Sequence, residues 1–338
     1  RDLHRLIRRQ RQMCIRDSFL EVQYVDEIYD ARRSEPIKRW VLMLPGAGCS
    51  WAKQSGGCSM CGFNYKLSQI NRGRRPLSTK LLKIFKLGKV LIESSNPSNL
   101  TIYNGGSFLN DEEIPWGVQQ EICKEVSKSP YLESLFIESR PEFVREGRIK
   151  FLNSLLGNKS FKVGIGLECV TDYYRKYYVH KGLSRYRFQK AINILRQNNV
   201  TPLVYVFLKP IHLEERESIN EAIRTVEYAF SIGAGEVALE SAFIQEGTVM
   251  KDLYVQGEFE PPWLWSIIEV IKQVHHLGPV YIGGFEDEPP PIDIPHNCPK
   301  CSSRIMKIFQ EYNKTLNVSL LKRRYCECMP IWKSRLLS

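Results

Sequence analysis

The chain has 338 residues, 43% of them hydrophobic, and its 48 Lys and Arg against 37 Asp and Glu give a formal net charge of +11. This length suits one large domain with an appendage, or two ordinary domains, and it excludes a small disulfide scaffold. No apolar run reaches the length of a membrane span and no apolar signal region precedes residue 35, so the sequence predicts a soluble, cytoplasmic protein without a membrane partner.

Residues 1–34 are interpreted as an N-terminal extension. Residues 1–18 contain six Arg and two Asp, and Arg11–Ser18 resembles translated sequencing-adapter sequence, so Cys14 is not counted as functional. Without this segment the net charge falls by four to +7. Residues 35–285 are expected to form the main domain. Residues 286–338 are expected to form a small basic element that begins with the Pro-rich linker Glu286–Pro295.

Short apolar runs alternate with stretches of helical periodicity through the main domain. Ser184 is the expected N-cap of one helix, and Ile219–Ser231 is expected to form another. Strands that alternate with helices indicate a parallel sheet. The expected strands are Val41–Leu44, Leu100–Tyr103, Leu135–Glu138, Val163–Leu167, Leu203–Leu208, Glu236–Leu239 and, more weakly, Val280–Ile282.

Polar or Gly-rich residues follow each of the six stronger strands. A (β/α) barrel collects functional groups at the carboxyl ends of all its strands, whereas an open doubly wound sheet concentrates them at one switch point. The sequence therefore favours an α/β fold with a partial barrel of six β/α units. The segments in question are Pro45–Cys49, Asn104–Phe108, Ser139–Glu142, Glu168, Lys209–Pro210 and Glu240–Ser241.

Cys49, Cys58 and Cys61 lie in the Gly-rich loop after the first expected strand. Thiolates suit zinc or iron–sulfur iron, but a structural zinc site normally has four ligands. Three thiolates can hold a [4Fe–4S] cluster and leave one iron open for S-adenosylmethionine. The alternative is a zinc loop completed by a distant histidine. The position after a strand and the lack of a nearby His favour the iron–sulfur cluster, with Phe63 placed to cover the adenine.

A second cysteine group has the pattern CxxC…CxC: Cys298, Cys301, Cys326 and Cys328. Four thiolates make a closed set, for which Zn²⁺ is the leading interpretation and a second iron–sulfur cluster the rival. His296 could replace one ligand. A helix is expected over Ile305–Tyr312. Nine Lys and Arg against two Glu in residues 298–338 favour a nucleic-acid partner over a merely solubilising surface.

The loop Pro45–Phe63, with Gly-Ala-Gly-Cys-Ser-Trp and Cys-Ser-Met-Cys-Gly-Phe, resembles the cluster loop of the archaeosine-biosynthesis radical-SAM family. The resemblance continues through Tyr103–Asn110, Ile137–Glu142, Gly164–Glu168 and the C-terminal cysteines, so it covers roughly residues 35–335. A more distant resemblance is to the radical-SAM domain of Elongator-type enzymes, which share the wide spacing of the first two cysteines.

This resemblance also assigns roles to residues at the strand ends. Ser107 stands where the superfamily usually has Glu, in a Gly-Gly-Glu loop. For each charged residue the alternative is a structural ion pair at the barrel rim. The cofactor-binding residues it implies are Phe63, Gly105, Gly106, Ser107, Glu138 and Arg140, and the catalytic or substrate-holding ones are Glu168, Lys209 and Glu240.

The implied reaction is the cleavage of the carbon–nitrogen bond of a lysine attached to a 7-deazaguanine base in tRNA, a lyase-type step. The implied partners are tRNA, an electron donor and a lysine-transferring subunit. Tyr173–Lys181 interleaves aromatic and basic residues, which suits RNA contact as well as an ordinary amphipathic helix. Two other functions stay open: a radical-SAM enzyme for a small molecule or peptide, and a zinc-containing nucleic-acid-binding protein.

Overall fold

The computed structural model describes residues 23–71, 74–285, 290–322 and 325–337. The adapter-like segment with Cys14, the first residues of the expected linker and two arginines of the C-terminal basic run lie outside the described residues. No helix within the described part of the chain is both long and apolar enough to cross a membrane.

The centre of the molecule is one curled sheet of eight strands that lie side by side in chain order. β1 and β2 are antiparallel, and every later neighbour is parallel. The α/β half-barrel expected from the sequence is therefore confirmed, with all seven expected strands present. The strands are β1 Gln23–Asp30, β2 Glu35–Met43, β3 Asn99–Tyr103, β4 Ser134–Glu138, β5 Ser160–Glu168, β6 Thr201–Leu208, β7 Glu236–Ser241 and β8 Val280–Ile282.

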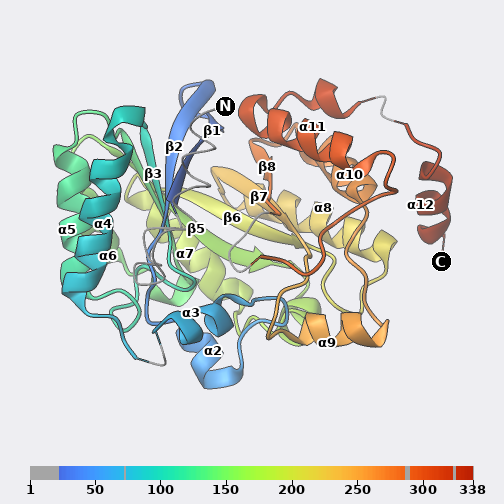
Figure 1. Ribbon diagram of the computed structural model, residues 1–338, viewed down its shortest axis with the longest axis horizontal. Helices are drawn as coiled ribbons and strands as arrows, with labels where there is room; N and C mark the ends of the chain where they lie inside the picture. The colour runs from blue at the N-terminus through green and yellow to red at the C-terminus, as the bar shows by residue number, and fades with distance from the viewer. Residues whose placement is uncertain (1–22, 72–73, 286–289, 323–324, 338) are drawn as a thin grey trace, which may run out of the picture.

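Helices cover the outer side of the sheet and one of its ends. In Figure 1, α4, α5 and α6 lie on one side of the molecule and α8 and α10 on the other, while α2, α3 and α9 gather at the lower end. The helices are α2 Ser50–Ser55, α3 Phe63–Asn71, α4 Ser78–Ile92, α5 Trp116–Lys128, α6 Glu146–Leu156, α7 Arg185–Gln197, α8 Glu215–Ser231, α9 Val249–Gln256, α10 Leu264–Val274, α11 Ser302–Thr315 and α12 Met329–Arg335. Short 3₁₀ helices are η1 Glu93–Ser95, η2 Pro141–Phe143 and η4 Val318–Leu321, and η3 Tyr174–Tyr178 is one turn of π-helix.

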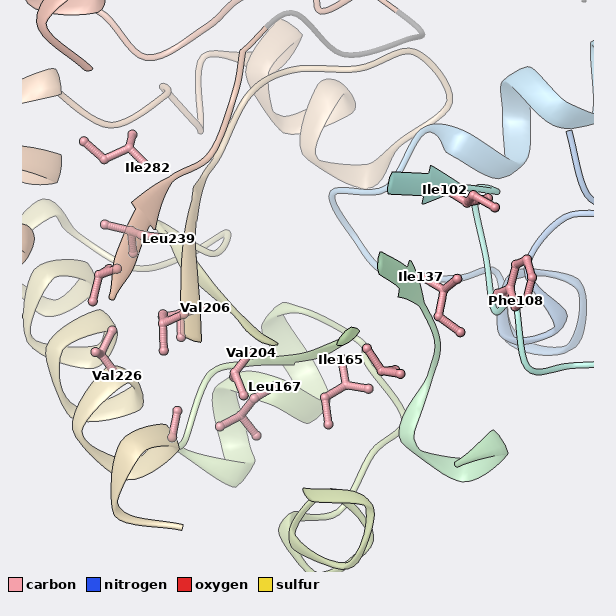
Figure 2. Packing of buried hydrophobic residues seen from close by; sticks show 14 of the residues in the cluster. Ile102, Phe108, Ile137, Ile165, Leu167, Val204, Val206, Val226, Leu239 and Ile282 are labelled. Atoms are coloured by element: carbon pink, nitrogen blue, oxygen red, sulfur yellow. The ribbon is translucent and has the colours of Figure 1, made fainter. Parts of the chain in front are cut away.

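Apolar side chains alternate along each parallel strand, so one face of the sheet packs against the helices. Figure 2 shows this layer running from Ile102 through Ile165 to Ile282, with Val206 of β6 facing Val226 of α8. The concave face is mixed, because the other half of each strand carries residues such as Tyr205 and Lys162. A half-barrel with a polar interior can hold a polar ligand above its strand ends.

β1 was not predicted, because residues 1–34 were interpreted as an extension. Its sequence, QYVDEIYD, is acidic and contains few strongly apolar residues. Pairing with β2 stabilises it instead: Asp26 forms an ion pair of 2.5 Å with Arg39, and Gln23 accepts a hydrogen bond from the Trp40 indole at 3.1 Å. Tertiary contacts override weak local propensity here.

The C-terminal element packs on the open side of the half-barrel. α11 contacts β1, β2 and β8. The Asn313 side chain bonds both backbone groups of Ile282, accepting at 2.9 Å and donating at 2.7 Å, and the Tyr312 hydroxyl donates to the Val280 carbonyl at 2.9 Å. The free edge of β8 is thus covered by α11, and this prevents β8 from pairing with a strand of another chain.

Candidate functional site

The loop that carries Cys49, Cys58 and Cys61 follows β2 and leads into α3. All three thiols are partly buried. Burial raises the pKa of Cys61 to about 12, and the neighbouring Cys58 contributes further. Burial also raises the pKa of Cys58, although the positive charge of Lys181 opposes this shift. A bound metal reverses this preference, because it displaces the thiol protons.

Glu113 fixes the start of this loop. Its side chain is almost completely buried, and one carboxylate oxygen accepts from the backbone N–H of Ser50 at 3.0 Å and from the Asn110 amide at 2.9 Å. The other oxygen accepts from the backbone N–H of Ser107. The Glu113 carbonyl also accepts from Ala47 at 3.1 Å. One buried carboxylate therefore joins the residue after Cys49 to the loop after β3.

The end of the loop is held by residues much later in the chain. The Gly62 N–H donates to the Gln245 side chain at 3.0 Å, after β7. Ser59 donates its hydroxyl to the Tyr178 carbonyl at 2.6 Å and its N–H to the Val179 carbonyl at 3.0 Å. The cysteine loop thus lies over the carboxyl ends of β3, β5 and β7, as a barrel mouth requires.

Gly105 and Gly106 pack directly against this loop. A Cβ on Gly105 would lie 2.6 Å from Leu67 Cδ1 and 3.3 Å from Phe63 Cβ, and a Cβ on Gly106 would lie 3.3 Å from Cys49 Cα. The hydroxyl of Ser107 accepts from the backbone N–H of Arg140 at 3.1 Å. Four of the expected cofactor-binding residues, Phe63 and Gly105 to Ser107, therefore gather beside the cysteines.

Charged side chains from β4 and β5 face the same loop. Glu168, at the end of β5, pairs with Lys181 at 2.7 Å, and this pair folds back over Gly166. Burial alone would lower the pKa of Lys181, but the charges of Glu168 and Cys58 outweigh it and raise that pKa. Arg140 donates to Glu142 and to the Lys181 carbonyl at 3.0 Å. Lys181 and Arg140 oppose the rise in the pKa of Cys58 and Glu168 adds to it, so charges of both signs lie beside the thiols.

The remaining expected residues are spread around the concave face. Burial and the nearby Glu138 raise the pKa of Tyr205, with Glu240 also contributing. Lys209, at the end of β6, forms an ion pair of 2.9 Å with the buried Glu215. Glu138, Glu240 and Lys209 thus come from three different strands of the half-barrel, and all three have partners within the protein.

The loop residues fit a [4Fe–4S] cluster with bound S-adenosylmethionine. Both polar atoms of Asn104, which precedes Gly105, are buried without a protein partner, and such atoms usually mark a ligand or water position. In the described residues, the loop thiols do not form the compact ligand set found at the C-terminus. Three thiolates can each bind one iron of a [4Fe–4S] cluster and leave the fourth iron open to another ligand.

The four C-terminal cysteines form a separate and tighter group. Their ligand atoms all lie within 4.8 Å of one another. The Sγ atom of Cys298 lies 3.7 Å from that of Cys301 and 3.5 Å from that of Cys326. The Sγ atoms of Cys301 and Cys328 are 3.7 Å apart. A tetrahedral ion with bonds of about 2.3 Å separates its sulfurs by about 3.8 Å. The Trp265 indole donates to Cys328 at 3.3 Å, as an outer partner of a metal ligand does.

Relatives of known name match most of this chain. No model of a protein family matches the chain. The chain is 28% identical to archaeosine synthase subunit beta of Methanosarcina acetivorans over 341 residues, 95% of each chain. It is 27% identical to archaeosine synthase subunit beta of Thermococcus kodakarensis, over 86% of this chain and 90% of that protein. The resemblance to archaeosine synthase subunit beta is confirmed.

A solved structure shares the fold. Elp3 of the archaeon Methanocaldococcus infernus, with an N-terminal deletion, superposes with a TM-score of 0.52 at 16% identity. The match covers 70% of this chain and 59% of that chain, so this chain spans less than two thirds of Elp3. At this level of identity the likeness concerns the fold alone.

Sequence reasoning did not find three residues of the site. Glu113 and Gln245 were not singled out, and Lys181 was grouped with the tyrosines of residues 173–178. The only signal near Glu113 was its place six residues after Ser107. Contacts such as Ser50 to Glu113, 63 residues apart, and Gly62 to Gln245, 183 residues apart, leave no local pattern.

Proposed function

We propose that this chain is a radical-SAM enzyme that modifies tRNA, and that it cleaves the carbon–nitrogen bond of a lysine adduct on a 7-deazaguanine base to form archaeosine. The observation that carries the proposal is the loop of Cys49, Cys58 and Cys61, clamped at the mouth of a half-barrel beside Gly105 and Gly106. The name of the relatives, archaeosine synthase subunit beta, supports archaeosine as the product.

Cys49, Cys58 and Cys61 would hold the [4Fe–4S] cluster. When bound with S-adenosylmethionine, the cluster supplies a deoxyadenosyl radical, which can break an unactivated C–H bond. Glu113, Gln245 and the packing of α3 hold the cysteine loop in place for this chemistry. Phe63, Gly105, Gly106, Ser107, Glu138 and Arg140 are the residues we assign to S-adenosylmethionine.

Glu168 and Glu240, from β5 and β7, are assigned to the substrate, where a lysine ammonium would replace their present partners within the protein. Lys209 is assigned to the lysine carboxylate. The nitrogen between lysine and base would stay on the base as an amidine, the carbon chain of lysine would leave as the second product, and the abstracted hydrogen would end in deoxyadenosine. The name "subunit beta" of the relatives leads us to propose a second subunit that supplies the lysine adduct, together with an electron donor.

We further assign a single Zn²⁺ ion to the C-terminal cysteines rather than a second iron–sulfur cluster. Three Sγ–Sγ separations between 3.5 and 3.7 Å support one tetrahedral ion. In a [4Fe–4S] cluster each thiolate binds its own iron, which would require wider separations. The ion would stabilise the element that covers the edge of β8.

The test is anaerobic reconstitution with iron and sulfide, followed by reduction with S-adenosylmethionine and adduct-bearing tRNA. We expect about four irons and one zinc per chain, deoxyadenosine, and archaeosine in the tRNA. Cys58→Ala should lose the iron and both products but keep the zinc. If the reaction contains the second subunit and adduct-bearing tRNA and still yields deoxyadenosine but no modified tRNA, a small-molecule or peptide substrate is favoured. Zinc at both sites and no iron would favour a nucleic-acid-binding protein.

A further inference from the structure

The tyrosine-rich turn η3 is attached directly to the cysteine loop. Besides the bonds from Ser59, the His180 ring lies 2.7 Å from the Gly57 carbonyl, and the Trp51 indole donates to the His180 carbonyl at 2.8 Å. A Cβ on Gly182 would lie 2.2 Å from the Trp51 ring, so this contact is close-packed. Residues 173–178 therefore keep a fixed position beside the proposed cluster.

The rings on this turn are ordered from the inside outward. Tyr174 and Tyr178 stack at 5.3 Å with an angle of 13° between their planes. The Tyr173 ring lies 5.4 Å from Tyr178 and 4.9 Å from Tyr177. Tyr173 and Tyr177 are each 56% exposed. The inner pair thus supports two outer rings that face solvent, in a position fixed before any partner binds.

The charges on the turn are divided in the same way. Arg175 is buried, where it donates to the carbonyls of Leu183 at 2.8 Å and Cys169 at 2.7 Å and pairs with Asp172. Lys176 is exposed, and its ammonium lies 4.8 Å from the centre of the Tyr177 ring. Arg175 therefore holds the turn in place, whereas Lys176 offers a positive charge next to an exposed ring.

We propose that Tyr173 and Tyr177 form a stacking platform for an unpaired base of the RNA substrate, with Lys176 binding the adjoining phosphate. The proposal rests on the tRNA-modifying function and adds the surface that receives the RNA. Proteins recognise unpaired RNA bases by stacking them on aromatic rings, and they bind the backbone with cations. The platform lies beside the loop where the reaction takes place, so a base held here would guide its neighbours toward the barrel mouth. A protein partner is the competing occupant, but an exposed lysine over a ring fits a phosphate-bearing ligand better.

The test compares matched double variants in the full-length, reconstituted protein. Tyr173→Leu with Tyr177→Leu removes the π faces but keeps apolar bulk, whereas Tyr173→Phe with Tyr177→Phe keeps both rings. We expect the Leu pair to weaken the binding of a tRNA transcript about tenfold to a hundredfold, with an unchanged salt slope, and the Phe pair to bind like the parent. Lys176→Met should weaken binding less and lower the salt slope by about one. Leu91→Ala, at a 57% exposed position on α4, is the control for loss of exposed apolar surface.

Thermal unfolding and the tRNA-independent cleavage of S-adenosylmethionine should match the parent in all these variants, which separates lost stacking from misfolding. If the Leu pair binds tRNA within twofold of the parent, the platform is refuted while the proposed function stands. If the Leu pair keeps tRNA but loses a second polypeptide, the surface belongs to a protein. If the parent itself does not bind tRNA at low salt, both the platform and the proposed function fail.

Discussion

Replacing Glu113 by Gln is expected to loosen the cysteine loop and the Gly105–Ser107 loop together. The carboxylate accepts from the Ser50 and Ser107 N–H groups on opposite oxygens and also from Asn110. A Gln amide has only one oxygen. Whichever way it is turned, at least one buried N–H then faces an NH₂ group and loses its acceptor.

The expected cost follows from these contacts. A buried donor without an acceptor costs about 1–3 kcal/mol, and a hydrogen bond to a charged group is worth about 1.5–3 kcal/mol. Solvent does not screen the loss, because Glu113 is only 1% exposed. We therefore expect Glu113→Gln to lower the free energy of unfolding by about 2–4 kcal/mol.

The assay is urea unfolding of anaerobically purified protein, with iron content and the KM for S-adenosylmethionine measured on the same samples. Glu112→Gln is the control, because the Glu112 carboxylate is exposed. This substitution should change the free energy of unfolding by less than about 0.5 kcal/mol. Less iron or a higher KM should accompany the instability of Glu113→Gln, since Glu113 touches both loops. A Glu113→Gln protein with the stability of the control and full iron would refute this reasoning.

Three further predictions concern other parts of the molecule. Gly106→Ala would place a Cβ 2.0 Å from Glu113 Oε2, so iron binding should fall several-fold while zinc stays; unchanged iron would contradict the close packing. Cys328→Ser should lose the zinc and lower Tm on the order of 10 °C without loss of loop iron, and a protein that retains one zinc would speak against the assigned ligand. The hydrogen bond and charge of Arg148 hold the pKa of Asp111 below its usual value. The interaction of Asp111 with Arg148 stabilises the folded protein fully above about pH 4, the usual pKa of Asp in the unfolded chain. This stabilisation is lost as pH falls through the lower pKa that Asp111 has in the folded state. Arg148→Gln should therefore lower Tm by roughly 1–3 °C at pH 7 and by less at pH 3, and an equal effect at both would exclude this linkage.

The sequence predicted those parts of the fold that local patterns encode. Apolar runs of strand length placed β2 to β8, and Ser184 caps α7 as expected, accepting from the Arg187 N–H at 3.3 Å. Cysteine spacing predicts both candidate metal sites. In each case the signal lies within about thirty residues of chain, where periodicity and motif spacing can be read.

The remainder depends on contacts between distant segments. β1 is a strand because β2 pairs with it, and the polar cluster of Lys162 with Glu236 at 2.6 Å forms only when β5 and β7 curve toward one another. The position of Lys209 shows the same limit. Its position at a strand end predicted a functional residue, and the structure adds a buried partner, Glu215, that the sequence could not connect to it.

That partner links the two ends of the molecule. Glu215 also accepts from the Trp263 N–H at 2.9 Å and from the Ser266 hydroxyl, and Ser266 in turn accepts from the indole of Trp332 on α12 at 2.8 Å. A continuous set of hydrogen bonds therefore connects the helix that follows Cys328 to Lys209 at the barrel mouth. Because Glu215 is buried and shared, displacing α12 would leave a charged hydrogen-bond network incomplete rather than merely expose surface. The C-terminal cysteine element is therefore joined to the mouth by hydrogen bonds, even though its cysteines form a site separate from the cysteine loop.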